Sequence, residues 1–459
     1  MHLDLPFSPT HAPRPHDAIR GVGGSLATLL HGLRSHTPRV LQLSKFYPPI
    51  RGGIETVAWE LTEGLNRMGV STDVLCSHDA RASVSDVGTA GYRVTRVGSL
   101  GRVLSTSIAP AMPATLKRMQ AGYDLIHLHM PDPMAALAVA LARPRGRLVV
   151  HWHSDVIRQR LAMHAYRHLQ EWVLARADAV IATSDAYAES SEVLRRWREK
   201  VRVVPIGISD HRGSALPHVT DALRTRHAGR RIVFSLGRMT HYKGFDVLIE
   251  AAAHLPDDCV VLIGGDGERL AMLRRQVAAR GLQHKVRLLG HVPDHELASH
   301  FEACDVFCMS STVRAEAYGV AILEAMVMGK PVVATDIAGS GVPWVNVHGA
   351  TGLNVPVSDP RSLADALRRL LDDAALRARL GAVARLRYTQ ELRAELMTMR
   401  TIRVYASLGV GVALAENDDE RGPVHADAAA SVGATASESA FALDTSQPDA
   451  PDMMRGNEP

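Results

Sequence analysis

The chain has 459 residues, of which 46% are hydrophobic, 22% charged and 5% aromatic, and its formal net charge is +4. This composition is typical of a globular protein, and the length favours two domains over a single hydrophobic core. No apolar run approaches the length needed to cross a bilayer, which argues against a helical membrane span. The first 36 residues also lack the compact apolar segment of a secretory signal.

The charge is distributed unevenly along the chain. From Ala415 to Pro459 there are ten acidic residues and two arginines, so this tail carries −8 and the preceding residues carry +12. The tail has almost no large apolar residues, and we expect residues 409–459, like the extension 1–37, to be disordered. A basic body suits an anionic partner such as a phosphate-bearing substrate, a membrane surface or nucleic acid, with a merely solvated surface as the alternative.

The four cysteines are scattered, and only Cys304 and Cys308 lie close together in the sequence. No second pair of metal ligands accompanies them, so we expect buried, unreactive thiols rather than a metal site. Scattered reduced thiols are typical of a cytosolic protein.

Short apolar segments alternate with helical ones along most of the chain, a pattern that predicts parallel α/β sheets. The predicted strands are 39–43, 72–75, 125–128, 148–150 and 179–182 in the first half, and 232–236, 259–263, 286–289, 306–309 and 331–334 in the second.

The interruption between these two series predicts two doubly wound, Rossmann-like domains that face each other across a cleft. We place the first domain at 38–205 and the second at 206–385, and expect a linker at 203–208 that continues as a polar stretch to about residue 229. A last helix, 386–408, is expected to pack back towards the first domain. Ligands of such domains bind at the carboxyl ends of the strands.

The first of these strand ends leads into a glycine pair. Gly52 and Gly53 precede a helix whose apolar face is Val57, Leu61 and Leu65. Backbone N–H groups at such a turn can bind an anion or a sugar hydroxyl, although many tight turns use two glycines for closure alone.

Two cations follow the strand that ends at Leu236. Arg238 and Lys243 can enter the cleft together and neutralise a diphosphate, because a guanidinium makes bidentate contacts with phosphate oxygens. The alternative is a loop with two surface cations.

The next strand ends in Gly264-Gly265-Asp266-Gly267-Glu268. This is not the G-x-G-x-x-G pattern, and no acidic residue is placed to bind a ribose as in dinucleotide enzymes, so we reject an NAD site. Gly265 remains a candidate for lining a nucleotide pocket.

The most informative segment runs from Glu316 to Glu324, followed by Gly329-Lys330-Pro331. A helix is predicted to begin at about Val320 and to end before Gly329, with Gly319 allowing backbone N–H groups to approach a phosphate. Glu316 would lie in the loop before the helix and Glu324 one turn inside it, on either side of that phosphate. An ordinary amphipathic helix with one solvated glutamate is the alternative for this segment alone.

Together these motifs resemble the family 4 retaining glycosyltransferases, which have the GT-B architecture. The resemblance covers roughly residues 38–406, and its strongest element is the pair Glu316 and Glu324 with the intervening Tyr318-Gly319. It implies that the chain transfers a hexose from a nucleotide sugar. One departure is Pro205-Ile206-Gly207, where the family often has asparagine after the proline, which puts local contacts in doubt but not the fold.

The resemblance also implies roles for residues of the second half. Arg238 and Lys243 would hold the donor diphosphate and stabilise the leaving group, and Glu316 would contact hydroxyls of the transferred sugar. Gly319 and Val320 would offer backbone N–H groups to that sugar or its phosphate.

The remaining donor contacts would come from both halves. Glu324 would bind the ribose, while Gly52 and Gly53 would close over the phosphate from the first domain.

Histidines at the strand ends of the first half complete the resemblance. His153 matches a family position where a histidine faces the reacting sugar, with Asp155 beside it on the acceptor side. For His151 we favour a structural role, and His129 either borders the acceptor site or packs internally.

The implied reaction needs little beyond charge stabilisation on the departing nucleoside diphosphate. No dedicated nucleophile is evident on the far face of the sugar. The resemblance implies retention, with the acceptor attacking from the face of departure and the leaving phosphate helping to deprotonate it. The domain body has no Asp-x-Asp motif, and we expect no cofactor and no required metal.

The block from His151 to Asp155 and the glycine turn are similar to bacterial mannosyl- and rhamnosyltransferases of exopolysaccharide and O-antigen assembly. This favours GDP-mannose as donor, with a UDP- or dTDP-sugar as the main competitor. The implied acceptor is a polyprenyl-diphosphate-linked saccharide at the inner face of the cytoplasmic membrane. Cations from Val156 to His168 could place a helix on an anionic bilayer, or could simply be solvated.

Other classes fit less well. A GT-B sugar-nucleotide epimerase would share the donor site but need no acceptor, and a donor sensor would not need the full Glu, Arg and Lys set. Nucleic-acid binding is suggested only by the charge, without stacking aromatics or a recognition motif.

Overall fold

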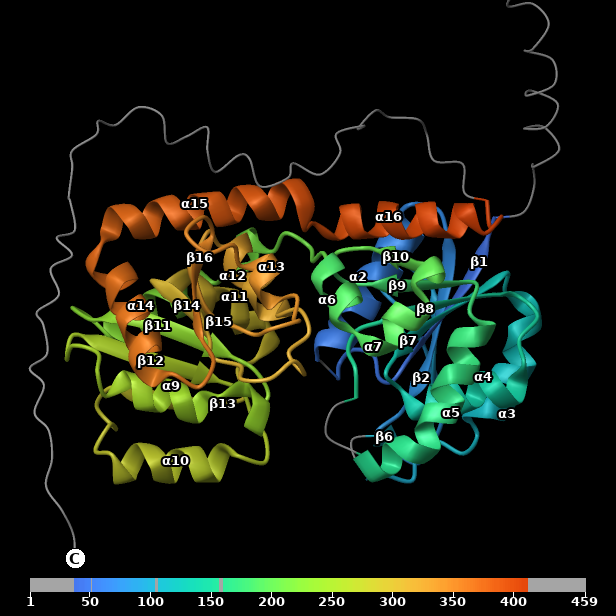
Figure 1. Ribbon diagram of the computed structural model, residues 1–459, viewed down its shortest axis with the longest axis horizontal. Helices are drawn as coiled ribbons and strands as arrows, with labels where there is room; N and C mark the ends of the chain where they lie inside the picture. Colours follow the sequence, from blue (N-terminus) through green and yellow to red (C-terminus); the bar gives the residue numbers. More distant parts are fainter. Residues whose placement is uncertain (1–36, 51, 104–105, 157–159, 412–459) are drawn as a thin grey trace, which may run out of the picture. The chain divides into compact units, whose positions relative to one another are not determined.

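In the computed structural model, the described residues are 37–50, 52–103, 106–156 and 160–411, with the side chains of 160–165 also left out. They form two large sheets with helices packed against them (Figure 1). The terminal segments expected to be disordered lie almost wholly outside these ranges. Within the described ranges, no helix combines the length and apolar character required to cross a membrane.

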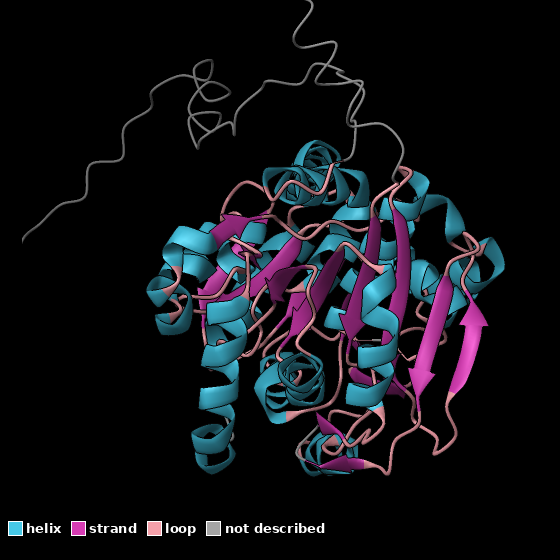
Figure 2. Cartoon of the chain, turned by 90° about the vertical axis from the view of Figure 1, so that its right-hand side faces the viewer, coloured by secondary structure: helices cyan, strands magenta, loops and turns pink. Residues whose placement is uncertain are grey.

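The first sheet has the strand order β10-β9-β8-β7-β1-β2-β4-β3, and all of its pairs are parallel except β3 with β4. Its central strands are buried over nearly their whole length, which explains their apolar runs. Figure 2 shows magenta strands flanked by helices. In chain order its strands are β1 (Arg39–Ser44), β2 (Ser71–Ser77), β3 (Val84–Val87), β4 (Arg93–Val97), β7 (Leu125–Met130), β8 (Arg147–Trp152), β9 (Ala179–Ala182) and β10 (Val201–Val203).

The second sheet is wholly parallel, with the order β13-β12-β11-β14-β15-β16. Its strands are β11 (Arg231–Leu236), β12 (Cys259–Gly264), β13 (Val286–Gly290), β14 (Val306–Met309), β15 (Val332–Asp336) and β16 (Gly352–Pro356). A separate two-stranded sheet pairs β5 (Arg102–Val103) with β6 (Thr106–Ser107) in antiparallel orientation. All ten predicted strands are present, and the two doubly wound halves are those expected.

Helices connect the strands of both sheets. Those of the first half are α2 (Gly53–Arg67), α3 (Met112–Met119), α4 (Pro133–Ala142), α5 (Arg160–Arg176), α6 (Asp185–Ser190) and α7 (Glu192–Arg196). The later ones are α8 (Pro217–Arg226), α9 (Phe245–Ala252), α10 (Leu270–Ala279), α11 (Asp294–Ala303), α12 (Val320–Val327), α13 (Val342–Val345), α14 (Pro360–Asp372), α15 (Ala374–Glu391) and α16 (Ala394–Ser407).

The last two helices contact different halves (Figure 1): α15 packs on α12 and α16 packs on α2. Gly64 of α2 makes the second contact close, because a Cβ there would lie 2.1 Å from Oγ1 of Thr398. Further along α16, Tyr405 reaches the first sheet and its hydroxyl lies 2.6 Å from Nδ1 of His127. Helix α16 therefore packs on the first half, and the predicted helix 386–408 spans the end of α15 and the whole of α16.

The structure corrects the predicted linker and adds strands that the sequence did not predict. The polar stretch before Gly229 contains α8, which packs on α11 and begins where the Leu216 backbone N–H donates to Oγ of Ser299 at 2.8 Å. Strand β3 is exposed throughout, and β16 contains glycine, asparagine and proline, so neither has the apolar signature of a strand.

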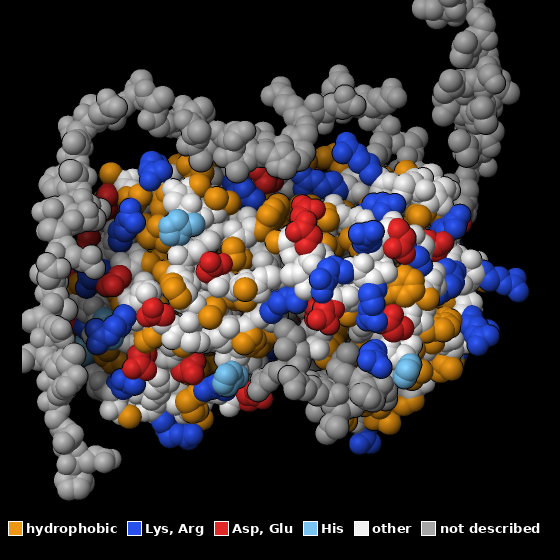
Figure 3. Space-filling view, in the orientation of Figure 1, with side chains coloured by type: hydrophobic (Ala, Val, Ile, Leu, Met, Phe, Trp, Pro, Cys, Tyr) orange, Lys and Arg blue, Asp and Glu red, His pale blue; other side chains and the backbone are white. Residues whose placement is uncertain are grey.

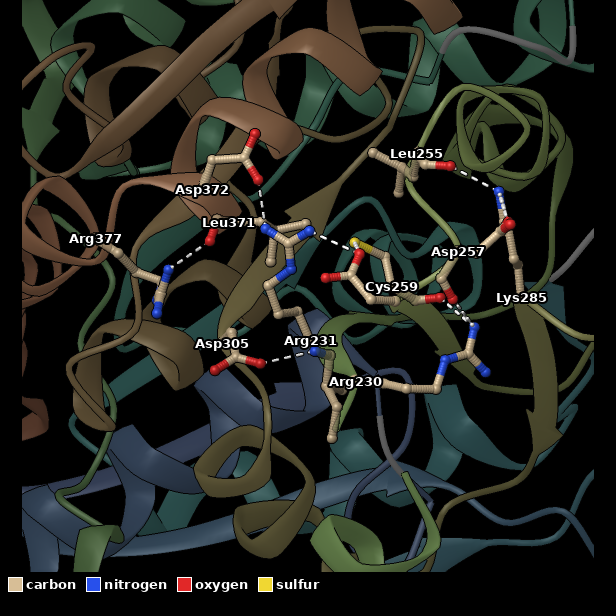
Figure 4. A network of polar contacts seen from close by, with 12 residues as sticks. Arg230, Arg231, Leu255, Asp257, Cys259, Lys285, Asp305, Leu371, Asp372 and Arg377 are labelled. Atoms are coloured by element: carbon tan, nitrogen blue, oxygen red, sulfur yellow. Dashed lines mark hydrogen bonds and ion pairs between the residues drawn. The ribbon is translucent and has the colours of Figure 1, made fainter. Parts of the chain in front are cut away.

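The amino-terminal edge of the second sheet is held by ion pairs (Figure 4). Arg231, the first residue of β11, pairs with Asp258 at 2.7 Å and with Asp372 at the end of α14. Lys285 pairs with Asp257 at 2.9 Å, just before β13. These partners are well exposed, and basic and acidic side chains also mix over the face seen in Figure 3.

All four cysteines are buried and free, as predicted.

Candidate functional site

The opposite, carboxyl edge of the second sheet has a buried ion pair. Nζ of Lys243 lies 2.5 Å from Oε2 of Glu316, and their side chains are only 12% and 11% exposed. Oγ of Ser311 donates to the same carboxylate oxygen at 3.0 Å. Burial alone would lower the pKa of Lys243, but the Glu316 carboxylate outweighs it and the pKa is raised. Lys243 is therefore a fixed cation beside a fixed carboxylate.

Arg238 adds a second cation at this edge. Its side chain is exposed, and no acidic side chain within the described ranges forms a salt bridge with it. Its charge still acts on its surroundings, because it opposes protonation of Lys243 and of Lys45 in the first half. An unpaired guanidinium next to a buried ammonium is suited to an anion with more than one negative charge.

The glycine turns at this edge bring backbone segments into contact. Gly265 has φ +132°, and a Cβ on it would lie 1.9 Å from the carbonyl oxygen of Gly237. Gly244 has φ +62°, and a Cβ there would lie 2.0 Å from the carbonyl oxygen of Ser310. No side chain fits at either position, so these glycines hold the loops after β11, β12 and β14 together.

Helix α12 begins as the sequence predicts, with Gly319 (φ +85°) directly before Val320. The glycine turn of the first half lies close to it, since a Cβ on Gly53 would be 3.8 Å from Cγ2 of Val320. Gly52 is extended, and a Cβ there would meet Oε2 of Glu55 at 2.4 Å. The starts of α2 and α12 therefore lie near each other.

Glu324 has a partner that the sequence did not reveal. Its Oε2 lies 2.6 Å from Nε2 of His211, in the segment predicted as a linker. Burial lowers the pKa of His211, but the hydrogen bond and charge of Glu324 outweigh it and the pKa is raised. Beside this pair the buried Glu60 accepts hydrogen bonds from the backbone N–H and hydroxyl of Ser209, at 2.8 and 2.6 Å.

The predicted histidines of the first half lie side by side on one face of β7 and β8. His129 and His151 are paired residues of the two strands and stack with ring centroids 5.3 Å apart. His153 follows β8, stacks on His151 at 4.3 Å and is 6% exposed. His151 is fully buried, which agrees with the structural role that we favour, and His129 is 1% exposed and lies internally behind His153.

Asp155 is held by both of its carboxylate oxygens. Oδ1 accepts hydrogen bonds from Nε1 of Trp152 at 3.0 Å and from Oγ of Ser191 at 2.8 Å. Oδ2 lies 3.0 Å from Arg314, which comes from the loop just before Glu316 and also covers the ring of Tyr187. Asp155 thus joins the two halves in this structure, and the sequence pattern did not predict Arg314 as its partner.

A second cluster at the ends of β1 and β7 was also not predicted. Burial lowers the pKa of Lys45, and the charges of Asp132 and Glu55 partly oppose this effect. Burial raises the pKa of Asp132 to about 6 and also raises that of Glu55. Asp132 caps α4 by accepting from the backbone N–H of Met134 at 3.1 Å, and its other carboxylate oxygen is buried with no partner within the described residues.

The described residues contain one histidine group with spacing close to that of metal ligands. One nitrogen each from His127, His129 and His151 lies within 4.8 Å of the others. All three rings are fully or almost fully buried and hydrogen-bonded to neighbouring side chains. The expectation that no metal is required stays a prediction.

Two Rossmann-like halves, with cations and a helix start at the strand ends of the second, form the GT-B architecture. Solved structures with this fold include Anabaena HepE with UDP and glucose (TM-score 0.67, 22% identity, 81% of this chain and 100% of that one). Sucrose-phosphate synthase from Thermosynechococcus elongatus is also similar (TM-score 0.69, 23% identity, 81% and 99%).

Sequence comparison places the chain within a family. The profile described as glycosyl transferases group 1 matches residues 224–387, and that of the glycosyl transferase 4-like domain matches 52–207. The chain is 30% identical to the O-antigen chain mannosyltransferase C of Escherichia coli (81% of this chain, 98% of the relative). It is 34% identical to the D-rhamnosyltransferase WbpZ of Pseudomonas aeruginosa (77% and 91%). The chain therefore belongs to the group 1 glycosyltransferases, and the predicted family, fold class and enzyme class are confirmed.

Proposed function

We propose that the chain is a retaining mannosyltransferase that uses GDP-mannose and transfers mannose to a lipid-linked saccharide. The observation that carries the transferase assignment is the buried Lys243–Glu316 pair at the carboxyl edge of the second sheet, beside Arg238, which pairs with no acidic side chain of the described residues. Such a set can hold a diphosphate with its cations and a sugar hydroxyl with its carboxylate.

In the proposed reaction Arg238, Lys243 and the amino terminus of α12 bind the diphosphate and stabilise the charge that develops on it. Gly319 and Val320 supply N–H groups at that terminus, where the helix dipole also favours an anion. Because these positive groups are fixed before the donor arrives, they need little reorganisation in the transition state. We propose that they act without a metal, so addition of EDTA should leave the rate unchanged.

The remaining groups position the sugars. Glu316, held by Lys243 and Ser311, accepts hydrogen bonds from the transferred sugar, while Glu324 binds the ribose. Gly52 and Gly53 close over the phosphate, and Gly265 keeps the loop of the nucleotide pocket in place. His153 faces the reacting sugar near the acceptor. The acceptor hydroxyl attacks on the face from which the phosphate departs, and the leaving phosphate takes its proton.

The donor assignment is supported by the chemistry of the relatives' sugars. One relative is a mannosyltransferase and the other a D-rhamnosyltransferase, and D-rhamnose is 6-deoxymannose. Both names thus point to a sugar of manno configuration. The O-antigen relative motivates our proposal of a lipid-linked acceptor and of a position at the cytoplasmic face of an anionic membrane. The cationic helix expected there overlaps α5, whose first side chains lie outside the described residues.

The test is a donor screen with the purified full-length chain. Binding and slow hydrolysis are measured for GDP-mannose, UDP-glucose, UDP-galactose, UDP-N-acetylglucosamine and dTDP-rhamnose. We expect selective GDP-mannose binding and slow release of GDP and mannose, with the α anomer formed on transfer to an acceptor glycoside. Selectivity for a UDP- or dTDP-sugar would contradict the mannosyl assignment but keep the class, and binding of none would contradict the transferase site.

A further inference from the structure

The four neighbouring histidines of the first half, of which His129, His151 and His153 stack, form two separate hydrogen-bonded pairs. In one, Nε2 of His127 lies 3.2 Å from Nδ1 of His151, and Nδ1 of His127 lies 2.6 Å from the hydroxyl of Tyr405 in α16. In the other, Nδ1 of His129 lies 2.8 Å from Nε2 of His153.

The second pair ends on a side chain of the neighbouring strand. Nε2 of His129 lies 2.7 Å from Oε1 of Gln42 in β1, and Gln42 is 0% exposed. Gln42 pairs with His127 across the two strands, so its side chain lies on the histidine face of the sheet. A buried series of hydrogen bonds therefore runs from Gln42 through His129 to His153.

The chemistry of these atoms fixes which of them donates and which accepts in each of these hydrogen bonds. An amide oxygen only accepts hydrogen bonds, so Nε2 of His129 carries the proton and donates to Gln42. In a neutral imidazole the other nitrogen is then an acceptor, so Nδ1 of His129 accepts from Nε2–H of His153. Nδ1 of His153 is left unprotonated, with a lone pair that no hydrogen bond from the described residues uses.

Burial favours this neutral arrangement. It lowers the pKa of His129 and of His153 well below the usual value, and the neighbouring imidazoles lower both further. This nitrogen is also not fully buried. Nδ1 of His153 has no partner within the described residues and is not among their fully buried unpaired atoms, unlike Nε2 of His151.

We infer that Gln42 is a positioning residue which, through His129, fixes His153 as a hydrogen-bond acceptor towards a sugar hydroxyl. The inference rests on the proposed function, in which His153 faces the reacting sugar. A neutral Nδ1 lone pair can accept a hydrogen bond from a hydroxyl of the donor sugar or of the acceptor, whereas the other tautomer would present an N–H. The direction of the Gln42 amide thereby sets the direction of the hydrogen bond between His153 and that hydroxyl.

The test measures the tautomer itself, by long-range ¹H–¹⁵N NMR of the full chain with ¹⁵N-labelled histidine and no donor present. The signals of His153 are assigned by their loss in His153→Gln. We expect His153 to be neutral and protonated at Nε2 in the wild type and in Gln42→Glu, because a carboxylate also accepts from His129. In Gln42→Met we expect a mixture of tautomers and a fall in kcat of at least about tenfold, the scale seen when an orienting partner is lost.

Tyr405→Phe is the matched control. It removes a hydroxyl from the other pair and leaves the series of hydrogen bonds from Gln42 to His153 intact, so the tautomer of His153 should not change. Protonation of His153 at Nδ1 in the wild type would overturn the inference, as would an unchanged tautomer in Gln42→Met. The measurement needs no substrate, so a wrong donor or acceptor assignment leaves its outcome unaffected. If Gln42→Met does not fold, the wild-type spectrum alone can still overturn the inference.

Discussion

The two edges of the second sheet both carry basic and acidic side chains, but these side chains serve different purposes at each edge. At the amino-terminal edge, Arg231 pairs with Asp258 and Asp372, whose side chains are 52% and 55% exposed. At the carboxyl edge, Lys243 and Glu316 pair with both side chains nearly buried, and Arg238 has no acidic partner within the described residues.

This difference separates stability from function. Exposed ion pairs contribute little and replace contacts that water would otherwise supply. A buried pair bears a desolvation cost that an apolar pair would avoid, so its presence in a ligand-binding edge indicates a role beyond stability.

The largest effect is expected from removing the buried pair. In Lys243→Met/Glu316→Gln, which leaves no lone buried charge, transfer should fall by at least about a hundredfold because charge on the leaving group is no longer stabilised. The measurement is kcat/KM for the donor. The control is Lys285→Met at the amino-terminal edge, which should keep the wild-type rate, and equal losses in both variants would contradict the comparison.

Gly265→Ala should destabilise the fold by roughly 2–4 kcal/mol, because its Cβ would overlap the Gly237 carbonyl in a left-handed backbone. Gly281→Ala is the matched control, since Gly281 also has positive φ but a Cβ there would meet nothing within 4 Å. It should cost only about 1 kcal/mol. Denaturant unfolding measures both, and similar costs would show that loop contact at the carboxyl edge is unimportant.

The His211–Glu324 pair should give stability that depends on pH. Because the folded-state pKa of His211 is raised above 6.5, its contribution is complete below that value and is lost as the pH rises through the folded pKa. The difference in Tm between wild type and Glu324→Gln should therefore be larger at pH 5.5 than at pH 9. A difference that is constant with pH would show that His211 is not charged in this pair.

The smallest effect is expected from Asp258→Asn/Asp372→Asn, which removes both acidic partners of Arg231 (Figure 4). Exposed pairs are worth at most about 1 kcal/mol each, so the Tm should fall slightly and more at low salt than at high salt. Donor KM should not change. A changed KM would mean that the amino-terminal edge influences the site.

Much of the fold could be predicted because central parallel strands are buried on both faces and appear as apolar runs. The exposed β3, and β16 with its glycine, asparagine and proline, lack that signal. The carboxyl-edge cluster could also be predicted, since Arg238, Lys243 and Glu316 each follow a strand of the same sheet and parallel strand ends lie together.

The partners that complete the site could not be predicted from local pattern. Gln42 and His129 are 87 residues apart, and Glu60 and Ser209 are 149 apart. Contacts of this kind depend on strand order and on the packing of the segment after β10, neither of which leaves a periodic signature. Gly237 and Gly265 could be picked out in the sequence, but the contact between them could not be predicted from it.

The most direct test of the central claim, that the carboxyl edge of the second sheet binds the donor diphosphate, is calorimetric titration. The ligands are the nucleoside diphosphate released in the donor screen and the matching monophosphate. We predict that wild type prefers the diphosphate by at least about tenfold, or about 1.4 kcal/mol, and that Lys243→Met/Glu316→Gln loses this preference. Equal affinity for both nucleotides in the wild type, or an undiminished preference in the variant, would contradict the account.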